Sequence, residues 1–442
     1  MITIRFKNTY FFSVLLMLSL MISCANKHPA VSKKETSSVE SVQTKITNNN
    51  EEEKSIVTGA DRFYNYLPLI KGKNIAIVAN QTSIMKLKQK FSRGPSTTGL
   101  KEVTHHIVDY FSTNYNIKVK TVFAPEHGFR GKADAGEHIK DGKDSKTGIP
   151  IISLYGKNKK PTQEQLKGLD AVVFDIQDVG ARFYTYISTL HYVMEACAEA
   201  NIPLIVLDRP NPNGHYIDGP VLEKEHTSFV GMHPVPVVYG MTIGEYAQMI
   251  NGENWLKNEV KCDLTVIELE NYTHDSEYSL PIKPSPNLPN DTSINLYPSL
   301  CFFEGTNVSV GRGTEFQFQI IGSPLFSKKD NYSFTPKPNF GSKFPENQDR
   351  VCFGYDLTKN KRLSTLDLSW LLEFNKDYTS FKNTQGYPSK ATLFNSFFTK
   401  LAGTKKLQQQ IEQGVKEEKI RKSWQSDLDA FKKIREKYLI YD

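Results

Sequence analysis

The chain has 442 residues, of which 39% are apolar and 23% are charged. This composition is ordinary for a soluble globular protein, and the length allows two domains. The 55 basic and 48 acidic residues give a net charge of +7, and the basic residues are scattered along the sequence. Because no DNA- or RNA-reading motif accompanies this mild charge, we expect no nucleic-acid partner.

The first residues have the pattern of a bacterial lipoprotein signal peptide. Arg5 and Lys7 precede a short apolar run over residues 10–22, and Cys24 follows one serine later. A basic start, a short apolar core and a small residue before the cut are typical of secretory signals. A cysteine at this point resembles a lipobox and indicates lipid attachment.

We therefore expect a lipoprotein signal peptide over residues 1–23 and lipidation of Cys24. Residues 24–55 are polar and almost free of aromatic residues, which predicts a disordered tether. The protein would then be exported and anchored by its lipid to a bacterial membrane, facing the periplasm. A plain signal peptide with an incidental cysteine is the alternative.

From residue 56 onward, short apolar runs alternate with helical patterns. The sequence predicts strands over 75–79, 117–124, 149–154, 171–174, 203–207 and 264–269, with a further short strand over 235–238. It predicts helices over 104–112, 161–169, 186–200 and 242–251. This alternation indicates βαβ units and a parallel sheet, so we expect a Rossmann-like α/β catalytic domain over residues 56–282. No Gly-rich nucleotide fingerprint follows the first strand, and we expect no cofactor.

The texture of the sequence changes at residues 281–298, which contain five prolines. They indicate a domain boundary or a proline-rich loop over the site. Strand-like, Gly-punctuated sequence follows over 302–324, and helical patterns over 364–375, 390–402 and 406–438 close the chain. We expect a smaller, mixed α+β C-terminal domain over residues 283–442 that closes the active-site cleft.

Three carboxylates stand at the ends of predicted strands. Glu126, Asp175 and Asp208 each follow a different strand. Because the carboxyl ends of parallel strands share one edge of a sheet, we expect these groups to converge on a crevice. Glu126, in a Gly-rich turn, is our candidate for a general acid. A glutamate that only orders the loop is the alternative.

Further polar clusters surround these carboxylates. The first spans residues 175–186 and holds two aspartates, an amide, an arginine and two tyrosines, which suit sugar hydroxyls and pyranose rings. The others are the loops 208–214, 304–307 and 311–314. Helix capping, turn chemistry and internal ion pairs are the alternative explanations. A divalent metal held by His127, Asp175, Asp178 and Asp208 is a further alternative.

Several of these motifs together resemble a known family. PEHGFRG (125–131), FDIQDVGARFYTY (174–186), LDRPNPNG (207–214), PSPNLP (284–289), EGTN (304–307) and GRGT (311–314) carry the resemblance, which covers about residues 58–442. They are similar to the exo-β-N-acetylmuramidases of the NamZ type, glycoside hydrolase family 171, formerly a domain of unknown function. Where that family has GELA, this chain has GEYA at 244–247.

The resemblance implies a glycosidase that releases N-acetylmuramic acid from the non-reducing ends of peptidoglycan fragments, in cell-wall turnover or recycling. Its partners would be muropeptides and saccharides of N-acetylmuramic acid and N-acetylglucosamine. Two alternatives stay open: a peptidoglycan- or sugar-binding lipoprotein without turnover, and a metal-dependent hydrolase.

The resemblance also suggests roles for particular residues. Glycoside hydrolysis needs an acid and a second group that acts as base, nucleophile or stabiliser. We expect Glu126 to be the acid, and rank Asp175 and Asp178 ahead of Glu304 for the second role. The substrate's acetamido group is a further candidate for that role. The expected substrate-binding residues are His127, Arg130, Glu137, Gln177, Arg182, Tyr184, Asp208, Arg209, Asn211, Asn287, Glu304, Asn307 and Arg312. Among them, Arg182, Arg209 and Arg312 are the candidates to read the lactyl carboxylate of N-acetylmuramic acid.

Overall fold

The computed structural model describes residues 54–92, 98–131, 137, 141–326, 331–385 and 391–442. The expected signal peptide, Cys24 and the tether up to residue 53 lie outside these ranges. Residues 54–442 form one compact unit. Within the described ranges, no helix is both long enough and apolar enough to cross a membrane.

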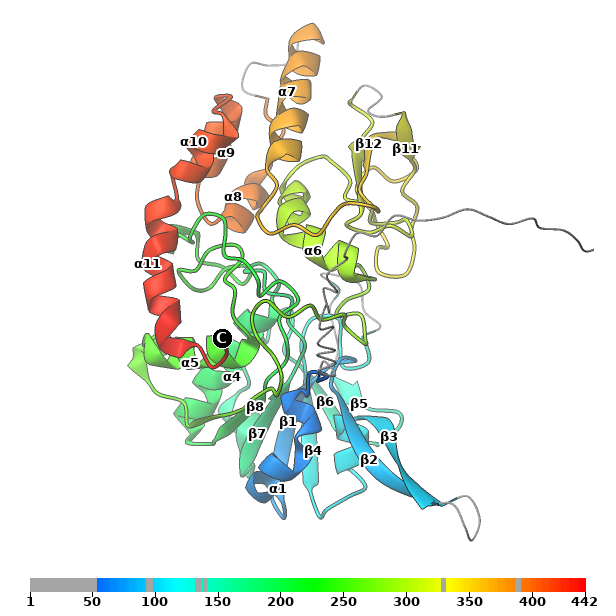
Figure 1. Cartoon of the computed structure of the whole chain (residues 1–442), viewed down its shortest axis with the longest axis vertical. Helices are drawn as coiled ribbons and strands as arrows, with labels where there is room; N and C mark the ends of the chain where they lie inside the picture. Colours follow the sequence, from blue (N-terminus) through cyan, green and yellow to red (C-terminus); the bar gives the residue numbers. More distant parts are fainter. Residues whose placement is uncertain (1–53, 93–97, 132–136, 138–140, 327–330, 386–390) are drawn as a thin grey trace, which may run out of the picture. The chain divides into compact units, whose positions relative to one another are not determined.

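A seven-stranded sheet forms the centre of the first part of the chain, with strand order β5-β6-β4-β1-β7-β8-β9 (Figure 1). Its strands are β1 (Asn74–Ala79), β4 (Lys118–Ala124), β5 (Gly142–Lys143), β6 (Pro150–Ser153), β7 (Ala171–Asp175), β8 (Leu204–Leu207) and β9 (Leu264–Ile267). All neighbouring pairs are parallel except β5 with β6. The expected Rossmann-like α/β fold is confirmed. The strand order reverses between β1 and β7, so the loops after these two strands run to opposite sides, and ligands of such sheets bind at a point of this kind.

Helices cover both faces of this sheet because side chains alternate along each strand. Ala76 and Val78 of β1 pack in the core that contains α4 (Tyr186–Ala200) and α5 (Ile243–Gly252). Ile75 and Ile77 pack on the opposite side, with α1 (Phe63–Ile70) and α2 (Ile107–Phe111). The apolar run of β1 is therefore buried on both faces, as a parallel strand requires.

A two-stranded antiparallel hairpin, β2 (Ile84–Ser92) with β3 (Thr98–His106), follows β1. The predicted helix over 104–112 is wrong in its first three residues, because residues 104–106 pair with residues 84–86 of β2. The helix predicted over 161–169 is shorter, α3 (Gln163–Leu166). The short strand predicted over 235–238 does not form, and within that range only Val238 makes isolated bridges, to Ala181 and Asp218.

The C-terminal region contains both helices and strands, as expected. It begins with α6 (Asp291–Leu300), and β10 (Ile320–Ser323), β11 (Tyr332–Phe334) and β12 (Cys352–Asp356) form an antiparallel sheet. The remaining helices are α7 (Ser369–Thr384), α8 (Ser396–Ala402), α9 (Lys406–Glu412), α10 (Glu417–Lys422) and α11 (Gln425–Arg435). The short 3-10 helices among the described residues are η1 (Gly59–Asp61), η2 (Lys224–His226), η3 (Lys257–Glu259), η4 (Cys301–Gly305) and η5 (Glu436–Tyr438). The single helix predicted over 406–438 is wrong: the chain turns at Gly414, which has φ +68°, and again near residue 424.

The end of the chain returns to the central sheet. Figure 1 shows α11 leading back to α5. The hydroxyl of Tyr441 donates to Asp208 Oδ2 at 2.7 Å, and the backbone N–H of Ile440 donates to Glu245 Oε1 at 2.9 Å. Asp208 lies beyond β8 and Glu245 lies in α5, so the last residues stabilise the sheet domain directly.

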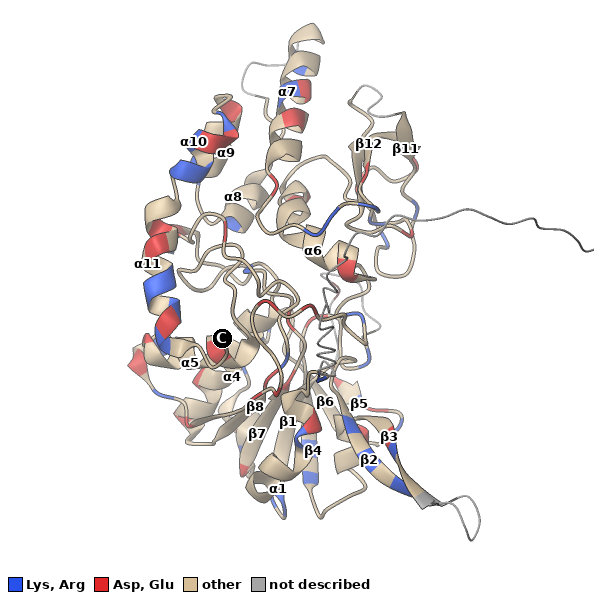
Figure 2. Cartoon of the chain, in the orientation of Figure 1, with Lys and Arg blue, Asp and Glu red and all other residues tan. Residues whose placement is uncertain are grey.

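Charged residues of both signs are mixed along α10 and α11 (Figure 2). α11, for example, carries Asp427 and Asp429 near its start and Lys432, Lys433 and Arg435 near its end. This order also matches the helix dipole, which favours acids at the N-terminal end and bases at the C-terminal end. The described surface of these helices thus offers no stripe of one sign that would suit a nucleic acid.

Candidate active site

A cavity of about 690 Å³ is lined by the sheet domain and by the C-terminal region together. The loops after β4, β6 and β7 supply Glu126, Tyr155 and Thr185. The segment 301–312 supplies Glu304 and Arg312 to the lining. The cavity therefore lies at the carboxyl ends of the parallel strands, where ligands of such folds bind.

Glu126 follows β4 in a tight turn. The backbone N–H of Gly128 donates to the Pro125 carbonyl at 3.0 Å, and both His127 and Gly128 have left-handed φ values, +68° and +77°. His127 is buried, and a positive φ is costly for a residue with a side chain. Strain of this kind is found where the position of a neighbouring group matters, and here that neighbour is Glu126.

A hydroxyl group holds the half-buried carboxyl group of Glu126, and a second one lies beside it. Thr185 Oγ1 donates to Glu126 Oε2 at 2.7 Å, and the phenol of Tyr155 lies close enough to interact with Glu126. Burial and the neighbouring Glu126 raise the pKa of Tyr155, so its phenol stays protonated. Hydroxyls both donate and accept hydrogen bonds, so these two can contact the carboxyl in its ionised and its protonated form. That is a suitable environment for a group that gives up and regains a proton.

Glu304 is a second carboxylate in the cavity lining. Arg312 contacts its Oε1 through Nη2 at 2.5 Å and through Nε at 2.6 Å. The Cys301 thiol lies 3.7 Å from Oε2. Burial alone would lower the pKa of Arg312, but the adjacent Glu304 raises it, so the guanidinium remains charged. The pair is a fixed dipole in the wall of the cavity.

The structure brings seven of the expected site residues into the cavity lining. They are Glu126, His127, Glu137, Tyr184, Asn287, Glu304 and Arg312. Other lining residues were not expected from the sequence, notably Tyr155, Thr185, Phe229, Lys343 and Phe344. Tyr155 lies two residues beyond the end of β6, so the strand-end argument that selected Glu126 also applies to it.

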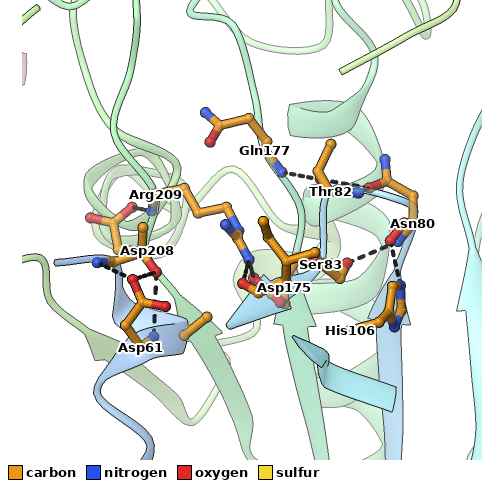
Figure 3. Close-up of polar contacts among 12 residues, drawn as sticks. Asp61, Asn80, Thr82, Ser83, His106, Asp175, Gln177, Asp208 and Arg209 are labelled. Atoms are coloured by element: carbon orange, nitrogen blue, oxygen red, sulfur yellow. Dashed lines mark hydrogen bonds and ion pairs between the residues drawn. The ribbon is translucent and has the colours of Figure 1, made fainter. Parts of the chain in front are cut away.

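Asp175, expected to be catalytic, does not line the cavity. It is fully buried, and Arg209 donates to its Oδ1 through Nε and Nη2, both at 2.7 Å (Figure 3). Burial raises the pKa of Asp175, and Arg209 opposes that shift. Asp175 and Arg209 therefore join the ends of β7 and β8, and we withdraw the catalytic role for the first and the lactyl-reading role for the second.

Asp178 and Asp208 are also engaged inside the protein. Asp178 Oδ2 accepts from the Tyr239 hydroxyl and from the Gly180 N–H, the latter at 2.7 Å. Asp208 accepts from the hydroxyls of Thr242 and Tyr441, each at 2.7 Å. Burial raises the pKa of Asp178 to about 6 and that of Asp208 to about 7. Since neither lines the cavity, we also withdraw Asp178 as the second catalytic carboxylate and Asp208 as a sugar ligand.

Arg182 has a structural role in place of the expected contact with a lactyl carboxylate. It is fully buried, and its Nη1 donates to the carbonyls of Pro220 and Val235, each at 2.7 Å. Its Nη2 donates to the carbonyls of Leu401 and Ala402 at 2.9 and 2.8 Å. These last two carbonyls end α8, so Arg182 fastens the C-terminal region to the sheet domain.

Four more of the expected ligands lie outside the cavity lining. Arg130 forms ion pairs with Asp109 and Asp144, each at 2.8 Å. Gln177, after β7, donates through its side-chain amide to the Pro210 carbonyl at 2.7 Å. Asn211, after β8, donates in the same way to the Met241 carbonyl at 2.9 Å. The fourth, Asn307, accepts at its backbone from the Asn347 side chain at 2.9 Å. All four hold loops of the site in place.

The alternative metal site is not assembled by the residues proposed for it. Among the described residues, ligand atoms close enough to share one ion belong to Glu223, Glu225 and His226. These lie at η2, outside the cavity lining, and both glutamates are exposed. His127, Asp175, Asp178 and Asp208 do not form such a group.

Comparison with known proteins agrees with this arrangement. Family models described as the N-terminal and C-terminal parts of the exo-β-N-acetylmuramidase NamZ match residues 75–292 and 295–441. The peptidoglycan β-N-acetylmuramidase NamZ of Bacillus subtilis is 38% identical over 403 residues, covering 87% of this chain and 91% of that protein.

Two crystal structures of DUF1343 family proteins from Bacteroides fragilis are also similar. One is 40% identical with a TM-score of 0.75, and the other 28% identical with a TM-score of 0.69. Each comparison covers 88% of this chain and 99% of the other. The chain therefore belongs to the NamZ family of exo-β-N-acetylmuramidases.

Proposed function

We propose that this chain releases N-acetylmuramic acid from the non-reducing ends of peptidoglycan fragments, in the cavity around Glu126, during cell-wall turnover or recycling. Its family makes it a glycosidase that acts on peptidoglycan saccharides. One observation carries the placement of the reaction. Glu126 stands at the end of a buried strand, lines the cavity and accepts a hydrogen bond from the Thr185 hydroxyl, with Tyr155 beside it.

In this proposal Glu126 donates a proton to the oxygen of the bond that breaks. The leaving sugar then departs as a neutral alcohol, and positive charge develops on the ring of N-acetylmuramic acid. Thr185 and Tyr155 are positioning residues, because their contacts fix the carboxyl group. Glu304 takes the second carboxylate role in place of Asp175 and Asp178, since it lines the same cavity.

The lactyl carboxylate of the substrate needs a cation in the cavity. Of the three arginines expected to supply it, Arg312 alone lines the cavity. Its guanidinium contacts Glu304 through Nε and Nη2, which leaves the donors of Nη1 for a second carboxylate. Arg312 is therefore our choice as the group that distinguishes N-acetylmuramic acid from N-acetylglucosamine.

The variant Glu126→Gln tests this function. Gln has the same size and keeps an acceptor for Thr185, but it has no acidic proton. We expect release of N-acetylmuramic acid to fall by about 10²–10⁴-fold, the usual contribution of a general acid. Binding of N-acetylmuramic acid, measured by calorimetry, and the unfolding temperature should change little.

The matched control is Glu164→Gln, an exposed glutamate of α3 outside the cavity, which should leave turnover unchanged. Near-normal turnover in Glu126→Gln would remove Glu126 from the mechanism. Calorimetric binding by the unaltered protein with no product formed would instead favour a non-catalytic binding protein. Loss of wild-type turnover in EDTA would favour a metal-dependent hydrolase.

We also propose that the protein is exported and anchored to a membrane through Cys24. The support is the order of basic, apolar and small residues before that cysteine. In the native host, the full-length protein should sediment with membranes and dissolve in detergent, while Cys24→Ala should be recovered in the soluble fraction or remain unprocessed. Equal incorporation of labelled fatty acid by the full-length protein and by Cys24→Ala would refute lipid attachment at Cys24.

A further inference from the structure

Phe344 is 91% exposed and yet lines the active-site cavity. Among the large apolar residues that the structure describes as exposed, its exposure is the highest, and it stands out even beside Phe340, which is 57% exposed. A fully hydrated phenyl ring gains free energy when an apolar surface covers it. Because Phe344 lies at the wall of the cavity, a ligand bound there can cover its ring.

The backbone that carries Phe344 is held in place on both sides. Asn339 and Ser342 exchange backbone hydrogen bonds of 3.0 and 3.1 Å. The Asn287 side chain donates to the Gly341 carbonyl at 2.7 Å. Gly341 has φ +98°, and an added Cβ there would lie 2.7 Å from Pro286. The ring is therefore presented by an ordered turn that is fixed to the proline-rich segment 284–289.

A neighbouring ion pair ties the same turn to the opposite side of the chain. Lys343 Nζ lies 2.7 Å from Glu137 Oε1, and both residues line the cavity. Glu137 follows the motif of residues 125–131 in the sheet domain. The contact joins the two parts of the chain next to Phe344, and because it is exposed it contributes about 0–1 kcal/mol.

The position of Phe344 identifies which part of the substrate it meets. A general acid acts on the oxygen between the sugar that is released and the sugar that leaves. Glu126 is half-buried and lies beside Thr185 and Tyr184, both buried, so the N-acetylmuramic acid ring occupies that enclosed end. An exo-acting enzyme keeps the rest of the chain on the solvent side. Phe344, the most exposed residue of the lining, lies at that open side.

We propose that Phe344 is the stacking platform for the leaving sugar, a β-linked N-acetylglucosamine ring. The ring substituents of this sugar are equatorial, so its axial C–H bonds form an apolar face that suits an aromatic ring. An aromatic face also attracts the positive edge of such C–H bonds through its quadrupole. The proposal rests on the proposed muramidase function and adds a binding site for the aglycone to it.

The test compares Phe344→Ala with Phe340→Ala in the full-length protein. Phe340 is on the same turn and is also exposed, but it does not line the cavity. The substrate is the disaccharide of N-acetylmuramic acid β-linked to N-acetylglucosamine, and released N-acetylglucosamine is quantified. Free N-acetylmuramic acid serves as a competitive inhibitor that occupies only the enclosed end.

We expect Phe344→Ala to lower kcat/KM for the disaccharide by about tenfold, because covering about half of a phenyl ring corresponds to one factor of ten in the rate. The inhibition constant of free N-acetylmuramic acid should stay within about twofold, since an affinity change of that size is under 0.5 kcal/mol. Phe344→Trp should retain wild-type kcat/KM, whereas Phe344→Leu should not. Phe340→Ala should match the wild type in both measurements.

An unchanged kcat/KM in Phe344→Ala would overturn the proposal. An equal change in the inhibition constant of N-acetylmuramic acid would also overturn it, because Phe344 would then contact the released sugar. Failure of the unaltered protein to cleave the disaccharide would instead refute the proposed function itself.

Discussion

Replacing Arg182 with Lys separates a structural role for this residue from the substrate-reading role that its sequence motif suggested. The guanidinium is fully buried, and burial lowers the pKa of Arg182 to about 9. Its Nη1 donates hydrogen bonds to the carbonyls of Pro220 and Val235, and its Nη2 donates to those of Leu401 and Ala402. One ammonium group has a single nitrogen, so it can reach one of these two pairs of carbonyls but not both.

The expected loss of stability follows from the pair of carbonyls that is left behind. A buried acceptor without a donor costs about 1–3 kcal/mol, so two of them cost about 2–6 kcal/mol. If the lysine contacts the first pair of carbonyls, those of Leu401 and Ala402 at the end of α8 lose their donor, and the contact between α8 and the sheet domain is lost. We therefore predict a drop of about 4 kcal/mol in the free energy of unfolding.

Urea unfolding followed by circular dichroism measures this loss. Arg362→Lys is the matched control, since Arg362 pairs with the exposed Glu277 and such pairs contribute about 0–1 kcal/mol. The selectivity of binding for N-acetylmuramic acid over N-acetylglucosamine is measured on both variants. Unchanged stability together with lost selectivity in Arg182→Lys would refute the structural role. It would instead support Arg182 as the residue that binds the lactyl carboxylate.

Two further predictions concern buried groups near the site. Burial raises the pKa of Asp178 to about 6, whereas an aspartate in an unfolded chain has a pKa of about 3.9. The protonated side chain therefore stabilises the fold below about pH 4. This stabilisation is lost as the pH rises through 6. Relative to Asp178→Asn, the wild type should therefore lose up to about 3 kcal/mol between pH 4 and pH 8, and a constant difference in unfolding free energy would contradict this. Gly403→Ala should lower the unfolding temperature more than Gly414→Ala, because both have left-handed φ values but only the new Cβ at 403 would meet a neighbour, Arg182 Nη2 at 2.7 Å. Equal losses in the two variants would show that Arg182 can move aside.

The sheet could be predicted from sequence because its strands are apolar runs buried on both faces. The helix expected over 186–200 coincides with α4, and the expected strand positions fall within a few residues of β1, β4, β6, β7, β8 and β9. The β2–β3 pair was missed although lysines alternate along β2 in the pattern of a half-buried strand, because its partner strand includes residues 104–106, which the sequence pattern assigns to a helix. Residues 104–106 became a strand because they pair with residues 84–86, about 20 positions earlier in the sequence.

The site was harder to predict than the sheet. Strand-end position correctly selected residues near the crevice, but it could not tell which carboxylates face a cavity and which are paired inside the protein. Asp175 is paired because Arg209 reaches it, and Asp208 because Tyr441 returns from the end of the chain, 233 residues later. Such partners are distant in sequence, so a local motif does not reveal them.

The central claim is that Glu126 faces the bond that breaks, and a crystal structure with N-acetylmuramic acid bound tests it most directly. We predict that the sugar occupies the cavity with its anomeric hydroxyl about 2.7 Å from the Glu126 carboxyl group, a hydrogen-bond distance. Phe344 should lie beyond that hydroxyl, on the solvent side. Binding outside this cavity, or an anomeric hydroxyl that contacts another carboxylate while Glu126 touches no part of the sugar, would contradict the account.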